Sequence, residues 1–192
     1  MRKKLMCLLA AMTFAASYGA ENITTDVVVV GGGGAGLSAA IAAKEKGANV
    51  VLVEKMLMLG GNTNYATAGI NAANTKLQKK LGIEDNAELF YNDTMKGGKN
   101  VNNPELVKKL TTDSANIIDW LTERGADLSE VVFTGGQSAK RTHRPAGGQA
   151  VGPVIVDALA ETAEKDGIDV RTESEVTKLI KTGDKVTGVE VK

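Results

Sequence analysis

The first run of apolar positions that fits a folded domain extends from Ile23 to Val30, with no charge after Asp26. A run this apolar is not typical of a strand with one wet face, so it predicts a buried central strand of a parallel sheet. Past a glycine-rich turn, Leu37 to Lys46 is rich in Ala, Leu and Lys and predicts a helix that ends at Gly47. Asn49 to Val53 predicts a second buried strand, which completes a right-handed βαβ unit.

The pattern becomes helical and polar beyond Lys76. A first helix is predicted over Glu84 to Met95, before Gly97 and Gly98. A longer helix is predicted from the N-cap Asn103 and the first-turn Pro104 as far as Gly125. The apolar residues of this longer helix that are expected to face inward are Leu106, Leu110, Ile117, Ile118 and Leu121.

The last third of the chain alternates again between helix and strand. A helix is predicted over Val151 to Lys165 and a short strand over Ile168 to Arg171. Glu175 to Lys181 and Lys185 to Val191 then predict a β-hairpin around a turn at residues 182–184. The alternation continues to the last residue, which is unusual for a complete domain.

Composition excludes several classes of protein. The chain of 192 residues has 23 Lys and Arg against 23 Asp and Glu, and a single Trp, so it lacks the basic surface that nucleic acid requires. One cysteine, Cys7, cannot build a disulfide framework or a zinc finger, and without a CxxCH motif no c-type haem can be attached. We therefore expect no metal site, and any redox chemistry must come from an organic cofactor.

The N-terminus has the pattern of an export signal. Arg2, Lys3 and Lys4 precede an apolar run from Leu5 to Ala16 that is too short to span a bilayer. This predicts a Sec-type signal peptide over residues 1–19, cleaved after Gly19 or after Ser17, and a periplasmic protein with no membrane span after its removal. An uncleaved anchor is the alternative.

The glycines between the first strand and the first helix carry the strongest chemical signal. Gly31, Gly33 and Gly36 form GxGxxG, in which they permit a tight turn, leave room for a pyrophosphate and allow close helix packing. The helix N-terminus adds partial positive charge. Together with the helix this motif predicts a dinucleotide site. Glu54 ends the second strand 18 residues after Gly36, where its carboxylate can accept hydrogen bonds from both ribose hydroxyls of the dinucleotide and would repel a 2′-phosphate. A glycine-rich turn without a ligand is the alternative.

A second cluster of small residues follows six residues after Glu54. It consists of Gly60 to Thr63 and Ala66 to Gly69. We expect this stretch to run as extended backbone over the dinucleotide and to lie flat against a large planar ring. A surface loop of small residues is the alternative interpretation.

Several segments in fixed order carry a resemblance to a known family. They are VVVVGGGGAGLSAAIAA, VVLVEK, GGNTNYATAGINAANT, DTMKGG, DWLTERGADL and RTHRPAGG. In this order and at these separations they resemble the fumarate reductase flavoproteins, above all the soluble periplasmic flavocytochrome c type and its urocanate reductase relatives. The resemblance covers residues 23–192.

The resemblance implies an α/β fold: a Rossmann-like FAD-binding domain with a helical segment and a β-hairpin, truncated at the C-terminus. The implied organisation is a βαβ unit and flavin loop over 20–76, a mainly helical segment over 77–146, and a return to the FAD-binding domain over 147–192. The implied FAD site comprises Gly31, Gly33, Gly34, Ala35, Gly36, Glu54, Lys55, Gly61, Asn62, Thr63, Thr67, Ala68, Gly69 and Val176. Within it, the flavin rests on Asn62, Thr63 and residues 67–69, and the backbone of Val176 meets the adenine.

Departures from the family pattern modify these expectations. Asn62 stands where membrane-bound relatives tether FAD through a histidine, and the only histidine here is His143, so we expect non-covalent FAD. The family's usual pair of small residues is Thr67 and Ala68, which could crowd the flavin. No haem domain is present, so the resemblance implies a separate c-type cytochrome as electron donor.

The resemblance also implies the activity: reduced flavin passes a hydride to the double bond of a dicarboxylate or related enoate. The family's substrate histidines, its proton-donating arginine and its second FAD segment correspond to positions beyond Lys192. No catalytic residue is therefore assigned to this chain. We expect that it does not turn over alone and that it is the N-terminal part of a longer enzyme. Two alternatives stay open: a truncated, non-catalytic nucleotide-binding remnant, and the same fold acting on urocanate, methacrylate or a 3-oxosteroid.

Two further residues allow both a functional and a structural interpretation. His143 lies among Lys140, Arg141 and Arg144 and could bind a substrate carboxylate or a phosphate, although packing within a positively charged return loop is favoured. Trp120 is expected in the core rather than as a stacking platform. The lysines Lys76, Lys79 and Lys80 are expected to form a solvated face.

Overall fold

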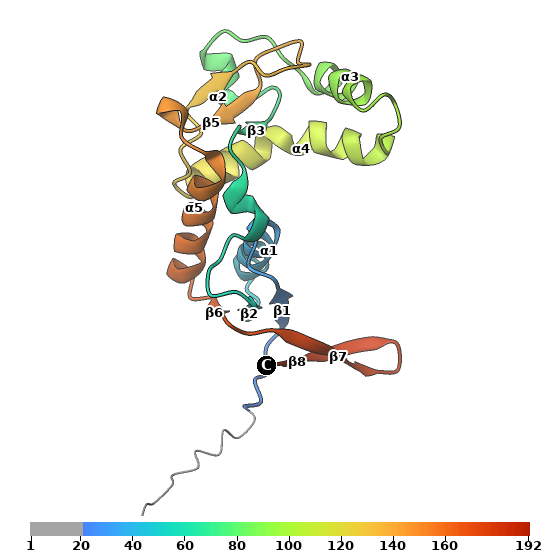
Figure 1. Cartoon of the computed structure of the whole chain (residues 1–192), viewed down its shortest axis with the longest axis vertical. Helices are drawn as coiled ribbons and strands as arrows, with labels where there is room; N and C mark the ends of the chain where they lie inside the picture. The colour runs from blue at the N-terminus through green and yellow to red at the C-terminus, as the bar shows by residue number, and fades with distance from the viewer. Residues whose placement is uncertain (1–20) are drawn as a thin grey trace, which may run out of the picture.

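The computed structural model describes residues 21–192, so the predicted signal peptide lies outside the described residues. The molecule is elongated, with a base, a head and a projecting hairpin (Figure 1). The base contains β1 (Val27–Val30), α1 (Gly34–Glu45), β2 (Val50–Val53), α5 (Val151–Lys165) and β6 (Asp169–Arg171). The head contains β3 (Ile70–Asn71), α2 (Lys76–Lys80), α3 (Ala87–Gly97), α4 (Pro104–Glu123), β4 (Glu130–Val132) and β5 (Thr142–Arg144). Two 3₁₀ helices, η1 (Gly61–Tyr65) and η2 (Ala146–Gly148), and the hairpin strands β7 (Val176–Thr182) and β8 (Lys185–Val191) complete the chain.

The base confirms the predicted βαβ unit. Strands β1 and β2 pair in parallel with Val27 opposite Val50, and β6 joins the other side of β2, also in parallel. Helix α1 ends where predicted, because Lys46 caps it and Gly47 follows with a φ of +85°, a conformation that favours glycine.

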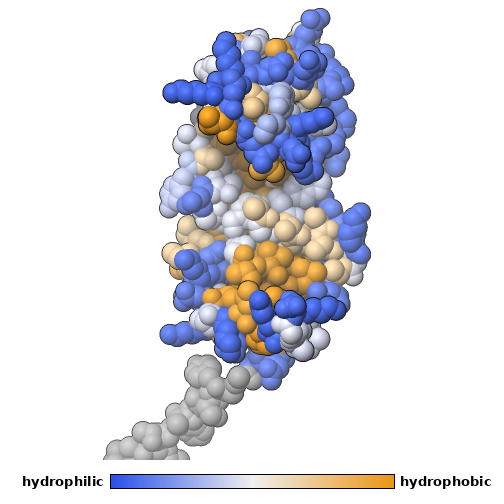
Figure 2. Space-filling view, turned by 90° about the vertical axis from the view of Figure 1, so that its right-hand side faces the viewer, coloured by the Kyte–Doolittle hydropathy of each residue, from blue (hydrophilic) through white to orange (hydrophobic). Residues whose placement is uncertain are grey.

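The prediction that the first strand is buried on both faces was wrong. Within the described residues β1 lies at the edge of the sheet, and Val28 and Val30 are 37% and 56% exposed. The strand with all four residues buried is β2, because it alone of the three has a neighbour on each side. The apolar run identified a strand correctly, but composition does not determine its place in the sheet. Figure 2 shows hydrophobic side chains gathered on the lower part of one face of the molecule.

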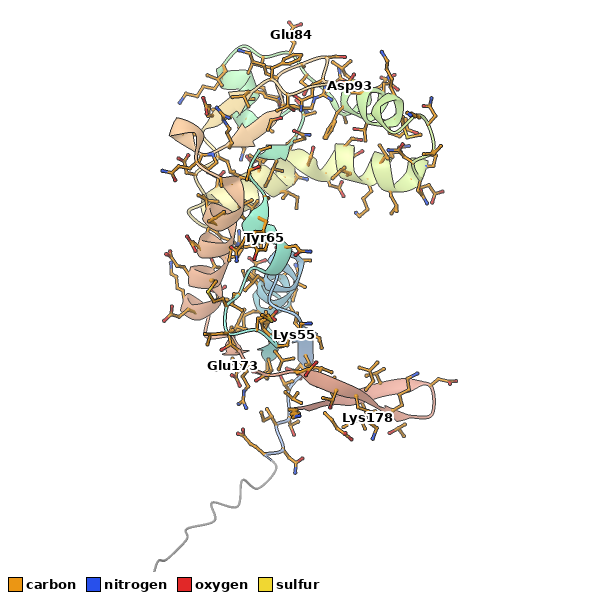
Figure 3. The ribbon with its side chains drawn as sticks, viewed as in Figure 1. Lys55, Tyr65, Glu84, Asp93, Glu173 and Lys178 are labelled. Carbon is orange, nitrogen blue, oxygen red and sulfur yellow. The ribbon has the colours of Figure 1, made fainter. Side chains whose placement is uncertain are left out.

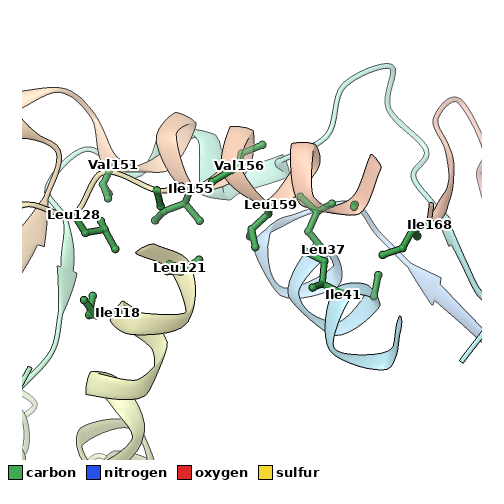
Figure 4. Close-up of a cluster of buried hydrophobic side chains, with 14 of the residues drawn as sticks. Leu37, Ile41, Ile118, Leu121, Leu128, Val151, Ile155, Val156, Leu159 and Ile168 are labelled. Carbon is green, nitrogen blue, oxygen red and sulfur yellow. The ribbon is translucent and has the colours of Figure 1, made fainter. Parts of the chain in front are cut away.

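The main hydrophobic core joins α1, α5 and the sheet. Leu37 and Ile41 of α1 are fully buried in one cluster with Leu159 of α5 (Figure 4). Leu52 of β2 belongs to the same cluster. The same cluster continues through Val151 into the head, where it meets α4. Burial of a large aliphatic side chain contributes about 1.5–3 kcal/mol, so this continuous cluster holds base and head together.

Helix α4 begins as predicted but turns a different face inward. Its buried residues are Val107, Thr111, Ser114, Ile118 and Leu121. Of the residues expected inside, Leu106, Leu110 and Ile117 are 67%, 55% and 48% exposed. The prediction counted only apolar residues, whereas the Thr111 and Ser114 hydroxyls are accommodated by hydrogen bonds to the backbone of their own helix. Trp120 is half-buried against the core, with the Arg124 guanidinium 3.8 Å above its ring.

The start of α4 yields a stability prediction. The Asn103 side chain accepts hydrogen bonds from the N–H groups of Glu105 and Leu106, at 3.0 and 3.2 Å. Replacement by alanine leaves these donors without a side-chain partner, so Asn103→Ala is expected to lower the free energy of unfolding by about 1 kcal/mol. Urea denaturation measures the change, and Asn103→Asp, which keeps the acceptor, is the matched control. Equal losses in the two variants would contradict the capping role.

The head also contains a small antiparallel sheet that the sequence did not predict. Strand β5 pairs with β3 on one side and with β4 on the other. These strands have two or three residues each, too short for a periodic signal to identify. The segment 77–146, predicted as mainly helical, contains helices α2, α3 and α4. Its strands β4 and β5 form a sheet with β3.

The predicted C-terminal hairpin is present and projects from the base (Figure 1). Strands β7 and β8 pair from Val176 opposite Val191 to Thr182 opposite Lys185, with two irregularities in register. Gly183 in the turn has a φ of +62°. Most of its side chains are exposed.

Candidate functional site

The glycine loop forms the tight turn predicted between β1 and α1. Gly31 has a φ of +101° and donates its N–H to the Val53 carbonyl at 2.8 Å. A Cβ added to Gly36 would lie 1.8 Å from the Gly31 carbonyl oxygen, so only glycine fits there. A Cβ at Gly33 would meet no atom closer than 3.6 Å, which leaves space over the turn for a ligand.

The N-terminus of α1 presents unpaired donors beside that space. The first intrahelical bond runs from the Leu37 N–H to the Gly33 carbonyl, at 2.9 Å. The N–H groups of Ala35 and Gly36 precede it and have no acceptor within the helix. The first turn contains no acidic side chain, and Ala35 is exposed. These features are those of an anion-binding helix N-terminus.

Glu54 lies at the end of β2, as predicted, and its carboxylate is buried beneath the turn. Its two oxygens accept one backbone N–H each, from Gly32 at 2.7 Å and from Met56 at 2.8 Å. Burial alone would raise the pKa of the Glu54 carboxyl, but the N–H groups of Met56 and Gly32, with Lys55 nearby, hold the pKa below its ordinary value. Each oxygen of the ionised group has a further lone pair, so the carboxylate can still accept ribose hydroxyls.

The second glycine cluster lies directly over the first. The Gly60 N–H donates to the Gly32 carbonyl at 2.8 Å, and the Thr63 hydroxyl accepts the Gly34 N–H at 3.1 Å. The expectation of a fully extended stretch was wrong, because residues 61–65 form the 3₁₀ helix η1. The chain is extended at Ala66, directly after η1, and bends at Ala68. Thr67 and Ala68 are exposed, as are Gly61 and Asn62.

Gly152 is a structural element of this region that sequence reasoning missed. Its N–H donates to the Ala66 carbonyl at 2.8 Å, and an added Cβ would lie 2.0 Å from the Thr63 carbonyl oxygen. The N-terminus of α5 is therefore in direct contact with η1. The only local signal was a glycine in the first turn of a predicted helix, which gives no indication of a partner some 85 residues away in the chain.

The remaining predicted site residues lie at the junction of the base with the hairpin. The N–H of Ser174 donates to the Glu54 carbonyl at 2.8 Å, and that of Glu173 donates to the Met56 carbonyl at 3.1 Å. Val176 opens β7 two residues after Ser174, so it lies near the end of β2 at Glu54. Lys55 is exposed, at the lower end of the base, whereas Tyr65 lies further up, at η1 (Figure 3).

His143 has a structural position in the head, as favoured by its sequence context. Its ring is fully buried on β5, with Nε2 2.9 Å from the Thr75 hydroxyl and Nδ1 2.9 Å from the Arg141 carbonyl. Because a carbonyl only accepts, Nδ1 carries the proton and Nε2 accepts from Thr75. The description of residues 140–144 as a charged return loop needs correction, since Arg141 is fully buried and paired with acids.

The burial of His143 makes the stability of the protein depend on pH. Desolvation lowers its pKa below the ordinary 6.5, although Asp85 nearby and backbone hydrogen bonds oppose the shift. The unfolded chain therefore binds the proton more readily than the folded protein does. The stability contributed by neutral His143 is complete above about pH 6.5 and is lost as the pH falls toward the lowered pKa. The free energy of unfolding is expected to fall by up to about 1.4 kcal/mol per pH unit in this interval. Urea denaturation between pH 5 and 7.5 measures it; His143→Gln, which does not titrate, should flatten the slope, and an unchanged slope would contradict the assignment.

Other features of residues 21–192 lie away from this site. One hollow in the surface lies in the head beside Asp85 and Leu89, and another lies between α2 and α4. In this part of the chain, no three metal-ligating side chains of the His, Cys, Asp or Glu type come together. None of its helices has the length and apolar character needed to cross a membrane. The exposed Lys76 pairs with Asp119 at 2.9 Å.

Comparison with known proteins agrees with this geometry. The family described as "FAD binding domain" matches residues 26–192. The NADH:fumarate oxidoreductase of Klebsiella pneumoniae is 49% identical over 187 residues, which cover 96% of this chain and 20% of that protein. The fumarate reductase (cytochrome) of Shewanella frigidimarina is 48% identical over 167 residues, covering 87% of this chain and 29% of that protein.

The fold is also similar to that of solved proteins. The open conformation of a flavocytochrome c3 fumarate reductase matches with a TM-score of 0.83 and 45% identity, over 87% of this chain and 30% of that one. The chain thus spans between a fifth and three tenths of these relatives. Since the family covers nearly all described residues, and the glycine turn, helix N-terminus and strand-end carboxylate lie where a dinucleotide needs them, the chain belongs to the FAD binding domain family.

Proposed function

We propose that FAD binds over the turn between β1 and α1, with its pyrophosphate on the N–H groups of Ala35 and Gly36. The open space above Gly33 and the absence of acids from the first turn of α1 support this position. The second lone pairs of the Glu54 oxygens accept the ribose hydroxyls. The flavin then lies toward η1 and residues 67–69, with Val176 beside the adenine and Lys55 close to Glu54.

The residues of the chain hold and orient the cofactor in this proposal. Bound FAD supplies hydride chemistry that no amino-acid side chain provides. Thr63 links the two loops through Gly34, and Gly152 allows α5 to hold η1 in place. The His143 ring is fully buried and hydrogen-bonded to Thr75 and to the Arg141 carbonyl. It is therefore not available to bind the flavin covalently, which supports non-covalent binding.

The activity we propose for the full-length enzyme is reduction of the double bond of fumarate or a related enoate. Its support is the similarity to relatives whose names contain fumarate, an NADH:fumarate oxidoreductase and a fumarate reductase (cytochrome). Their names give two electron donors, NADH and a cytochrome, and we propose a c-type cytochrome as the donor. Urocanate is the second candidate substrate, because a urocanate reductase of Eggerthella lenta is 38% identical over 78% of the chain.

The export pattern of residues 1–19 supports a periplasmic location. Mass spectrometry of the mature N-terminus after expression tests it: a start at Ala20 or Tyr18 is expected, whereas an intact Met1 in a membrane fraction would show the uncleaved anchor.

The single observation that carries the cofactor proposal is the convergence of the α1 N-terminus and the Glu54 carboxylate on one open turn. Titration of the purified protein with FAD, followed by quenching of flavin fluorescence, is expected to saturate at one FAD per chain. Acid precipitation should then release all the colour into the supernatant, because the cofactor is held without a covalent bond. Colour retained in the precipitate would contradict non-covalent binding, and a titration without saturation would contradict the site.

A further inference from the structure

A buried ion pair in the head is not used by the proposed cofactor site. Arg141 is fully buried and makes a bidentate pair of hydrogen bonds to the Asp85 carboxylate, from Nε at 3.0 Å and from Nη2 at 2.9 Å. Its Nη2 also lies 3.0 Å from Asp93 of α3, and its guanidinium lies over the Phe90 ring, 4.8 Å from the centroid. Asp85 is fully buried as well.

The backbone of Arg141 contacts the chain just after the flavin loop, by which we mean residues 60–69. Its carbonyl accepts the N–H of Ala72 at 2.9 Å and also lies 2.9 Å from the His143 ring. Strand β3, which contains Ile70 and Asn71, pairs with His143 and Thr142. The Asn71 side chain accepts the Thr142 hydroxyl at 2.7 Å. Residues 70–72 are thus held to residues 141–143 by strand pairing and by side-chain and backbone hydrogen bonds.

This contact extends to the end of the flavin loop itself. Gly69 has a φ of +152°, and a Cβ there would lie 2.6 Å from the His143 carbonyl oxygen. The loop is therefore anchored at two points: η1 rests on the glycine turn and α5, and Gly69 rests on β5. Thr67 and Ala68, which are exposed, lie between these anchors.

Stability alone does not call for an ion pair at this position. Replacement of a buried ion pair by apolar residues of similar volume is often neutral or stabilising, because desolvation offsets the attraction. A guanidinium that donates two hydrogen bonds to one carboxylate fixes the relative orientation of the two side chains. Here the two bonds to Asp85 orient Arg141, the residue just before β5, and β5 pairs with β3, which directly follows Gly69.

We infer that Arg141 and Asp85 are positioning residues for the flavin loop, which hold residues 67–69 at the place where the isoalloxazine ring is bound. The inference rests on the proposed function for its consequence on FAD. Its structural part, that the pair fixes the loop, concerns the protein without FAD.

The test uses Arg141→Lys, which keeps the charge and loses the fork. Phe90→Leu is the matched control, because it removes the ring beside the same guanidinium and leaves the two Arg141–Asp85 hydrogen bonds their partners. Hydrogen exchange followed by mass spectrometry on the full chain without FAD should show exchange at residues 69–72 accelerated about tenfold in Arg141→Lys and little changed in Phe90→Leu. With FAD bound, Arg141→Lys is expected to show faster FAD dissociation and an altered visible circular dichroism of the flavin.

The two readouts separate the possible failures. If both variants lower the melting temperature alike and leave exchange at 69–72 and FAD dissociation as in the unaltered protein, Arg141 only stabilises the head and the inference is overturned. If the unaltered protein binds no FAD, the proposed function fails, and the exchange data alone decide whether the pair fixes the loop.

Discussion

A Gly36→Ala protein is expected to lose FAD binding. The added Cβ would lie 1.8 Å from the carbonyl oxygen of Gly31 and 3.0 Å from its carbonyl carbon, and both are backbone atoms that no side-chain rotation can move. To accommodate the methyl group, α1 must move away from β1 or the turn must open. Either change displaces the N–H groups of Ala35 and Gly36 from the position that we propose for the pyrophosphate.

Both binding and stability should report this change. We expect FAD affinity to fall by more than about 100-fold and the free energy of unfolding to fall by about 3 kcal/mol, the scale of severe overpacking. Gly135→Ala is the matched control, because no atom lies within 4 Å of its Cβ position and its φ is not positive. Titration with FAD and urea denaturation of both variants measure the effect. Equal affinity of Gly36→Ala and Gly135→Ala would show that the close approach of α1 to β1 is not required.

Glu54→Ala is expected to weaken FAD binding by about 1.5–3 kcal/mol, or roughly 10- to 150-fold. Two losses add in this variant. The ribose hydroxyls lose an ionised acceptor, and the N–H groups of Gly32 and Met56 lose the carboxylate that positions the turn.

Glu54→Gln separates these two losses. The amide keeps the size of the side chain, but its NH₂ group would face one of the two backbone donors, so the turn is only partly held. Its FAD affinity is expected between that of the unaltered protein and that of Glu54→Ala. Fluorescence titration measures all three proteins at one salt concentration. Identical affinities would remove Glu54 from the ribose, whatever the state of the turn.

The parts of the fold predicted correctly are those in which the signal is local. The βαβ unit has apolar strands, an alanine-rich helix and a glycine at its C-terminal end, and all of them act within a few residues. Helix α4 was found from Asn103 and Pro104 for the same reason. Its buried face was not, because Thr111 and Ser114 satisfy their hydroxyls internally while Leu106 and Leu110 remain exposed.

The parts that the sequence did not reveal depend on contacts between distant residues. Strand β3 has two residues and exists only because β5, some 70 residues later, pairs with it. The contact of Gly152 with Thr63 and the burial of Arg141 between Asp85 and Asp93 likewise join segments with no common local pattern. For the candidate site, the glycine turn and Glu54 were found from spacing, whereas the anchors of the flavin loop required the structure.

The central claim is that FAD is held by the turn between β1 and α1. Two-dimensional ¹⁵N NMR of the protein during FAD titration tests it most directly, because each backbone N–H reports its own surroundings. The account predicts saturable shifts of the amide signals of Ala35, Gly36 and Met56, with Gly135 in the head unchanged. Saturable shifts confined to the head, or no shift at these three amides at saturating FAD, would contradict it.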